Sequence, residues 1–169
     1  RSVGMILLLV SIVFLGIALF SSLIHVKSGK LIWLIGLMVL FAGLYFSYSA
    51  EGMNFHSAST VSNTTILGAS MMFYMLFLCM LISCLLKATK IISNTAVILL
   101  GAANAVFFVL PIITDVFFYD TWSWWALVQI IANTVLAICL IKEFLASKTR
   151  VRWLYIGAFL PLLAFAVDV

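Results

Sequence analysis

Residues 142–152 read Lys-Glu-Phe-Leu-Ala-Ser-Lys-Thr-Arg-Val-Arg, which places four cations within eleven residues of a chain that is only 8% charged. Long apolar runs lie on both sides of this stretch. Clusters of Lys and Arg in short loops between membrane spans mark the cytoplasmic side of a membrane protein. The stretch therefore predicts a cytoplasmic loop between two membrane-spanning helices, and the rest of the chain is oriented from it.

The composition lies far outside the range of soluble proteins. Of the 169 residues, 66% are hydrophobic, whereas about half is usual in soluble domains, and the mean hydropathy is +1.32. A helix needs roughly 20 apolar residues to cross the hydrocarbon core. We therefore predict an all-α fold, a polytopic transmembrane helical bundle that forms a single domain over residues 1–169. The expected spans are residues 3–24, 31–49, 66–86, 91–113, 122–141 and 153–169.

Charges divide sharply between the two sides of this predicted bundle. Of the five acidic residues, Glu143 alone falls on the inner side. This bias predicts a multi-pass protein of the plasma (inner) membrane with its N terminus outside. The net charge of +4 suits anionic lipid headgroups at the inner face and does not point to nucleic acid; a homodimer or another membrane subunit is a further candidate partner. Eight of the nine Lys and Arg fall on the inner side: Lys27, Lys30, Lys87, Lys90, Lys142, Lys148, Arg150 and Arg152.

The outer side gathers acidic and aromatic residues into a candidate ligand-binding surface. Acidic groups there suit a cation, an amine or a proton, and aromatic rings suit a cationic ligand. The alternative interpretation is a set of solvated loop acids beside an interfacial aromatic belt, which Trp124 and Trp125 would join. His56 lacks a second His or Cys at ligand spacing, so no metal site is predicted. The candidate residues are Glu51, His56, Asp115, Tyr119, Asp120, Trp122 and Asp168.

Three amide side chains fall within the predicted spans, namely Asn104, Gln129 and Asn133. Gln129 and Asn133 are four residues apart, so they share a helix face. Because spans four and five are consecutive, an amide contact with Asn104 is expected between them. Such contacts usually hold membrane helices together, and the alternative is that the amides line a path for a substrate.

Catalytic signatures do not occur in the sequence. It has no Gly-Xaa-Ser-Xaa-Gly, no His-Glu-Xaa-Xaa-His and no phosphate-binding loop, which are the patterns that mark common catalytic sites. We therefore expect neither an enzyme nor a cofactor-binding protein. The three cysteines, Cys79, Cys84 and Cys139, fall in apolar runs without metal-ligand spacing and are predicted to be membrane-buried side chains.

The order of four features carries a family resemblance. A basic loop, His25 to Lys30, leads into the aromatic span Trp33 to Tyr48, and Glu51-Gly52 follows. Leu85-Leu86-Lys87 closes the third span, and residues 148–153 open a last span that contains Pro161. This order resembles the bacterial seven-transmembrane receptors with diverse intracellular signalling modules (7TM-DISM). The chain looks like the first six helices of that family.

The resemblance implies a function that the residues alone do not specify. Members of the family carry an extracellular sensory domain, seven helices and a cytoplasmic output such as a histidine kinase or a diguanylate cyclase. The seventh helix and both other parts are missing from this chain. The expected function is therefore the membrane-embedded region of a bacterial signal-transduction receptor that relays an extracytoplasmic signal to an output module elsewhere in a longer chain.

Two alternatives come from other classes of protein. A small-solute or cation carrier or channel would use Asn104, Gln129, Asn133 and Asp168 along its path, and an accessory membrane subunit would bind another membrane protein. The sequence begins at Arg1 without an initiator Met and stops at Val169 in an apolar run, which predicts a fragment of a longer protein.

Overall fold

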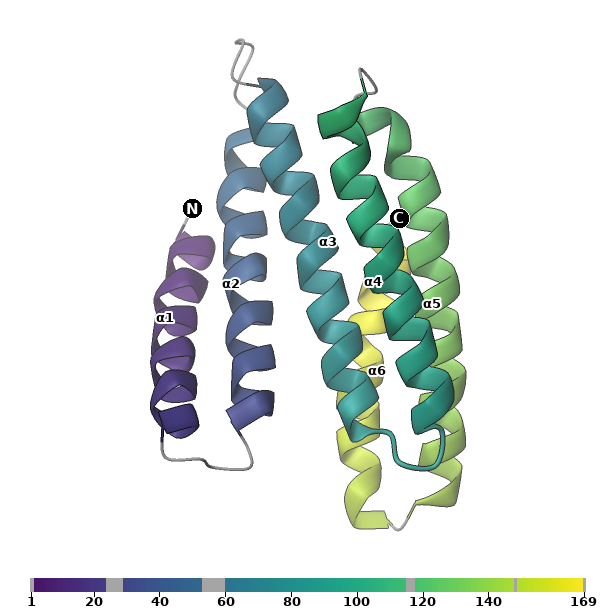
Figure 1. The fold of residues 1–169 in the computed structure, drawn as a ribbon. Helices are drawn as coiled ribbons and strands as arrows, with labels where there is room; N and C mark the ends of the chain where they lie inside the picture. Colours follow the sequence, from purple (N-terminus) through teal and green to yellow (C-terminus); the bar gives the residue numbers. More distant parts are fainter. Residues whose placement is uncertain (1, 24–28, 53–59, 115–117, 148, 169) are drawn as a thin grey trace. The chain divides into compact units, whose positions relative to one another are not determined.

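The computed structural model describes residues 2–23, 29–52, 60–114, 118–147 and 149–168. Within these residues the regular secondary structure is helical (Figure 1), as predicted for an all-α bundle, and each predicted span overlaps one helix. The helices are α1 (Ser2–Leu23), α2 (Gly29–Gly52), α3 (Thr60–Leu85), α4 (Lys90–Ile113), α5 (Phe118–Ala146) and α6 (Thr149–Asp168).

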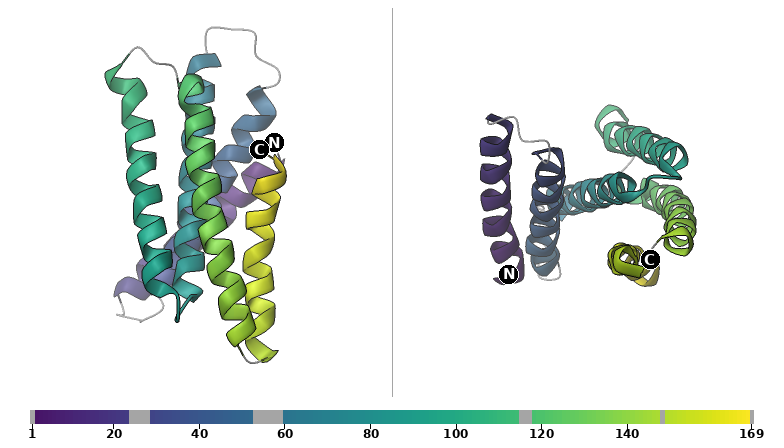
Figure 2. Two further views of the ribbon diagram at one scale, coloured as in Figure 1. Left: turned by 90° about the vertical axis from the view of Figure 1, so that its right-hand side faces the viewer. Right: turned by 90° about the horizontal axis from the view of Figure 1, so that it is seen from below.

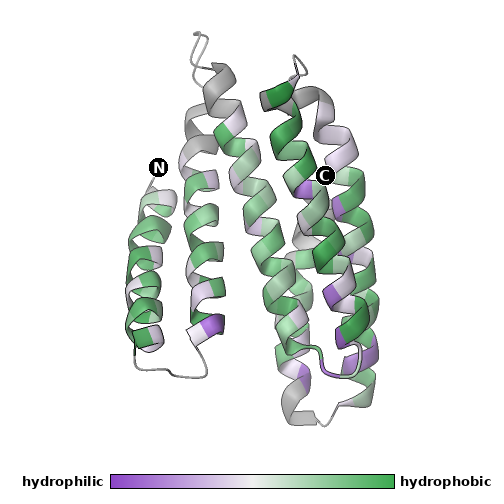
Figure 3. Cartoon of the chain, in the orientation of Figure 1, coloured by the Kyte–Doolittle hydropathy of each residue, from purple (hydrophilic) through white to green (hydrophobic). Residues whose placement is uncertain are grey.

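Among the residues that the structure describes, five helices are long and apolar enough to cross a membrane, which makes this a multi-pass membrane protein. Figure 3 shows hydrophobic residues along most of their length. Large aliphatic side chains such as Leu23, Ile91 and Ile113 are exposed, and a lipid bilayer covers apolar surface of this extent. The sixth predicted span lies on α6, which is not one of the five. The crossing segments are Val3–Leu23, Gly29–Ser47, Thr65–Leu85, Lys90–Leu110 and Thr121–Ala146.

The chain divides into two compact units, Arg1–Leu81 (unit 1) and Ile82–Val169 (unit 2). Each unit has its own packed helices and is described by itself below. The prediction of a single domain over residues 1–169 stays a prediction.

Unit 1 is built on close packing of α1 along α2, which run in opposite directions (Figure 1). Two glycines of α2 permit the approach. A Cβ atom at Gly43 would lie 3.0 Å from the backbone nitrogen of Leu8, and one at Gly36 would lie 2.9 Å from a methyl carbon of Leu15. Small residues let membrane helices approach this closely, as the seven-residue spacing of these glycines predicts.

Polar and aromatic contacts complete unit 1. The indole nitrogen of Trp33 on α2 donates to the hydroxyl of Ser22 on α1 at 3.0 Å. The ring of Phe41 on α2 stacks on two rings of α3, Phe73 at 5.0 Å and Phe77 at 5.7 Å between centroids. Stacked rings at these separations stabilise the pairing of helices beyond the area that they bury.

In unit 2, α5 lies between α4 and α6 and packs on both (Figure 2). The turn between α3 and α4 and the connection between α5 and α6 lie at the same end of this unit (Figure 1). That arrangement puts the basic residues of both connections on one side, as the charge pattern predicts. We call this the inner end of unit 2.

The stretch at residues 142–152 differs from the loop that its charge predicts. Helix α5 continues to Ala146 and α6 begins at Thr149, so residues 147 and 148 alone separate the two helices. Lys, Glu, Leu and Ala are good helix formers, and a helix that leaves the hydrocarbon core has no reason to end there. Polarity in this stretch therefore does not mark the end of a helix.

Candidate functional site

Glu143, near the inner end of α5, is a buried acid with an exposed fraction of 7%. Its Oε1 atom accepts hydrogen bonds from three consecutive backbone N–H groups in the α3–α4 turn: Lys87 at 2.8 Å, Ala88 at 2.5 Å and Thr89 at 3.1 Å. Successive N–H groups that point at one site form an anion-binding concavity. A side chain of α5 therefore occupies the anion site that the turn before α4 creates.

The start of α4 explains why this contact forms. The first N–H groups of a helix need acceptors outside the helix, and a side chain at the N-cap usually supplies one. Thr89 occupies the N-cap of α4 but makes no side-chain cap, and its buried Oγ1 has no hydrogen-bond partner in the described part of the chain. Glu143 brings both the acceptor and a negative charge to this positive end of the α4 dipole.

A second polar contact joins the end of α3 to the beginning of α4. The hydroxyl of Ser83 donates to Oδ1 of Asn94 at 2.7 Å and lies 2.9 Å from the hydroxyl of Ser93. The hydroxyl of Ser93 in turn donates to the backbone carbonyl of Lys90 at 3.1 Å. Buried hydroxyls paired in this way fix the angle between two helices that a short turn connects.

The connection from α5 to α6 is held by Arg152, which follows the gap between the two helices. Its Nε atom donates to the carbonyl of Ser147 at 3.3 Å, and its guanidinium carbon lies 5.3 Å from the centre of the Phe144 ring. A cation at this distance is attracted to the face of the ring. The inner ends of α5 and α6 are thus fixed to each other by a basic side chain.

The three amides predicted to be buried are buried: Asn104, Gln129 and Asn133. On α5, Nε2 of Gln129 donates to Oδ1 of Asn133 at 2.9 Å, as expected of residues that share a helix face. Asn104 on α4 accepts a hydrogen bond of 2.8 Å from the indole nitrogen of Trp125 on α5. A hydrogen bond between α4 and α5 is therefore present, with an indole as its donor.

Trp125 is a core residue, contrary to the interpretation that places it in an interfacial belt. Its exposed fraction is 0%, whereas its neighbour Trp124 is 68% exposed. The ring of Trp122, which is half-buried, lies 4.8 Å from the ring of Trp125. The three tryptophans at positions 122, 124 and 125 look alike in the sequence, but the helix does not turn all of them inward.

The other outer candidates fall mostly outside the described side chains. Glu51 lies on α2, Tyr119 and Asp120 lie on α5, and Asp168 ends α6. His56 and Asp115 lie outside the described residues. The acidic and aromatic ligand-binding surface therefore stays a prediction.

No protein-family model, no curated protein and no solved structure matches the chain. Function is argued below from the contacts of this chain.

Sequence reasoning assigned Glu143 to the inner side but did not select it as a functional residue. The signal was present, since Glu143 is the only acid among the inner cations and interrupts the most basic stretch of the chain. Its partners are backbone N–H groups 54 to 56 residues earlier, and backbone partners leave no trace in a sequence.

Proposed function

We propose that this chain is the membrane-embedded region of a bacterial signal-transduction receptor, which relays an extracytoplasmic signal to a cytoplasmic output module. The observation that carries the proposal is the Glu143 contact, in which α5 holds the turn between α3 and α4. A switch needs an element with two discrete arrangements, and this contact is either made or broken. The resemblance to 7TM-DISM receptors supports the same class.

Helix α5 is the element suited to carry a displacement. It runs without interruption from Phe118 to Ala146, so its outer end bears Trp122 and Trp125 and its inner end bears Glu143. Helix shifts of roughly 1–2 Å are typical of switching proteins. A sliding motion of that size lengthens hydrogen bonds of 2.8 and 3.1 Å beyond the range in which they persist.

Release of the turn changes the charges that the inner end presents. Lys87 supplies the first of the three N–H groups and Lys90 follows the third, and both side chains are exposed. When the carboxylate leaves, the start of α4 loses its acceptor and these two cations are free to move with the turn. A cytoplasmic module or an anionic lipid surface then meets a different arrangement of charge, which is how the signal would leave the membrane.

The test uses the full-length polypeptide in native membranes. We expect its reading frame to continue into a cytoplasmic output module, and Glu143→Gln to change the basal activity of that module by about tenfold, the factor that 1.4 kcal/mol produces. Lys142→Gln is the matched control, because this neighbour is exposed. A reading frame that encodes no output module, or equal activity of the two variants, would contradict the proposal that this chain belongs to a receptor.

A small-solute or cation carrier is a second candidate, favoured by the burial of Asn104, Gln129 and Asn133 in two membrane-crossing helices. Uptake into proteoliposomes that Gln129→Leu abolishes and Thr134→Val preserves would support a polar path through unit 2. Thr134 is an exposed polar residue of the same helix, and its hydroxyl donates to the carbonyl of Ile130 in that helix, which makes it the appropriate comparison. Wild-type vesicles without flux of any tested cation or amine would count against the carrier.

A further inference from the structure

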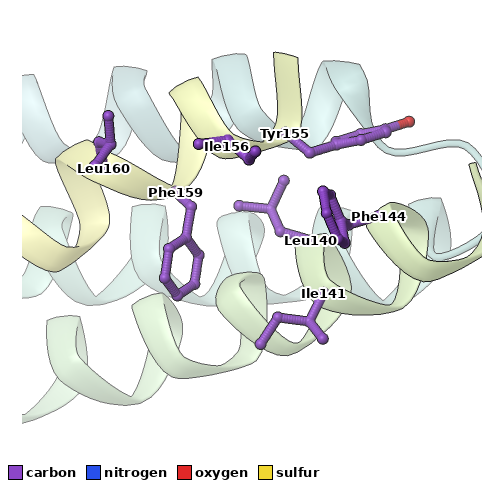
Figure 4. Close-up of a pocket in the computed structure, with 7 residues that line it drawn as sticks. All are labelled: Leu140, Ile141, Phe144, Tyr155, Ile156, Phe159 and Leu160. Carbon is purple, nitrogen blue, oxygen red and sulfur yellow. The ribbon is translucent and has the colours of Figure 1, made fainter. Parts of the chain in front are cut away.

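An apolar groove of about 190 Å³ lies between α5 and α6, near the inner end of unit 2 (Figure 4). The side chains that line it come from facing sides of the two helices. They are Leu140, Ile141 and Phe144 of α5 with Ile156, Phe159 and Leu160 of α6, and Tyr155 completes the lining. Sites that enclose a whole drug-sized molecule measure roughly 300–1,000 Å³, so this groove fits a segment of a longer ligand.

The lining defines the chemistry of that segment. Every lining residue other than Tyr155 has a purely hydrocarbon side chain, and Figure 4 shows the hydroxyl of Tyr155 directed away from Leu160, toward the end of the groove near Phe144. An occupant with hydrogen-bonding groups along its length would leave them unsatisfied, which is costly in an apolar site. A hydrocarbon chain meets this condition. Ile156 and Leu160 are partly exposed, so such a chain can enter from the side.

A fixed cation stands at the inner end of the groove. The guanidinium of Arg152 lies 5.3 Å from the centre of the Phe144 ring, one of the lining side chains. Its Nε atom donates to the carbonyl of Ser147, and a guanidinium carries further N–H donors on its two terminal nitrogens. Guanidinium nitrogens in pairs are the preferred donors for phosphate.

We propose that this groove is a binding site for an anionic phospholipid of the inner leaflet, with one acyl chain between α5 and α6 and the phosphate at Arg152. The apolar lining and the cation are adjacent in the order that an inner-leaflet lipid requires, with the charge at the membrane surface and the hydrocarbon below it. The site does not depend on whether the chain signals or transports.

The test uses the full-length protein in phosphatidylcholine nanodiscs that contain phosphatidylglycerol with a photoreactive diazirine on one acyl chain. We expect crosslinks to residues 140–144 and 155–160. Arg152→Gln should lower the crosslinked fraction about fivefold, the factor that corresponds to one cation near an anionic surface. Lys90→Gln removes another exposed inner cation and should leave the yield unchanged.

A second pair of variants tests the groove itself. Ile156→Trp fills it and should abolish the crosslinks, while Ile138→Trp changes an exposed isoleucine of α5 that does not line the groove and should preserve them. Circular dichroism confirms that each variant remains helical. Equal losses of crosslinking in the Arg152 and Lys90 variants would show that the inner cations attract headgroups without a specific site, and would overturn the proposal. Crosslinks confined to other residues, or two protein copies joined through the groove, would overturn it as well.

Discussion

The carboxylate of Glu143 on α5 accepts a hydrogen bond of 3.1 Å from the backbone N–H of Thr89, the N-cap residue of α4. The cap of one helix is thus supplied by the side chain of another helix, 54 residues later in the chain. The stability of the α3–α4 turn therefore depends on the position of α5, because one contact joins them.

Glu143→Ala is expected to lower the free energy of unfolding by about 2–3 kcal/mol, since charge-assisted hydrogen bonds contribute roughly this much. The variant leaves the three N–H groups of residues 87–89 without their acceptor. Reversible unfolding in mixed micelles measures the effect. Lys142→Ala, at the adjacent exposed position, should stay within about 0.5 kcal/mol, and a similar loss in both variants would rule out a special role for the carboxylate.

Thr89→Val is expected to be neutral or stabilising. At an ordinary N-cap the loss of the hydroxyl costs about 1 kcal/mol, but the hydroxyl of Thr89 is buried and makes no hydrogen bond among the described residues. Removing an unsatisfied buried hydroxyl relieves a desolvation cost. The same unfolding measurement decides the matter: a loss of 1 kcal/mol or more (about the ordinary cost of a lost N-cap) would mean that Thr89 caps α4 itself.

Trp125→Phe should cost about 1–2 kcal/mol, because it removes the indole donor from Asn104, a buried acceptor, at the energy seen for polar contacts between membrane helices. Comparing the double variant Trp125→Phe with Asn104→Leu to the two single variants isolates the interaction between the two side chains. We expect a coupling free energy of about 0.6 kcal/mol or more between the two positions. Strictly additive losses would indicate that the two side chains act independently.

Gly43→Ala should weaken the packing of α1 on α2, since the added methyl group would lie 3.0 Å from the backbone nitrogen of Leu8, closer than ordinary van der Waals contact. Gly16→Ala is the matched control, with nothing within 4 Å of its added Cβ, and it should gain up to about 1 kcal/mol from helix propensity. Opposite signs of the two effects in thermal unfolding are the expected outcome; a stabilising Gly43→Ala would contradict the close approach.

Lys87→Cys, in a chain with its three native cysteines replaced by serine, tests the predicted orientation. We expect a membrane-impermeant maleimide to label it in inverted vesicles and not in intact cells, because the inner end of unit 2 carries the basic residues. Labelling of this cysteine in intact cells would mean that the chain has the opposite orientation in the membrane to the one predicted.

Hydropathy predicted the helices, because apolar length is a property of the residues themselves, whereas the expectation that the basic connections face the cytoplasm stays a prediction. The Glu143 contact could not be predicted, since its partners are backbone groups, and the inward position of Trp125 beside the exposed Trp124 depends on the rotation of α5. The end of α5 was misplaced because a polar stretch was taken as a loop, although Lys, Glu, Leu and Ala are good helix formers.

Helix α5 has 29 residues, which corresponds to about 43 Å and exceeds a hydrocarbon core of roughly 30 Å. A helix of this length tilts or extends into the headgroups, and the balance between the two depends on the thickness of the bilayer. Glu143 lies at the end that moves when the tilt changes. We therefore expect bilayer thickness to affect the contact that joins α5 to the start of α4, which would make the lipid composition of the host membrane an input to this protein.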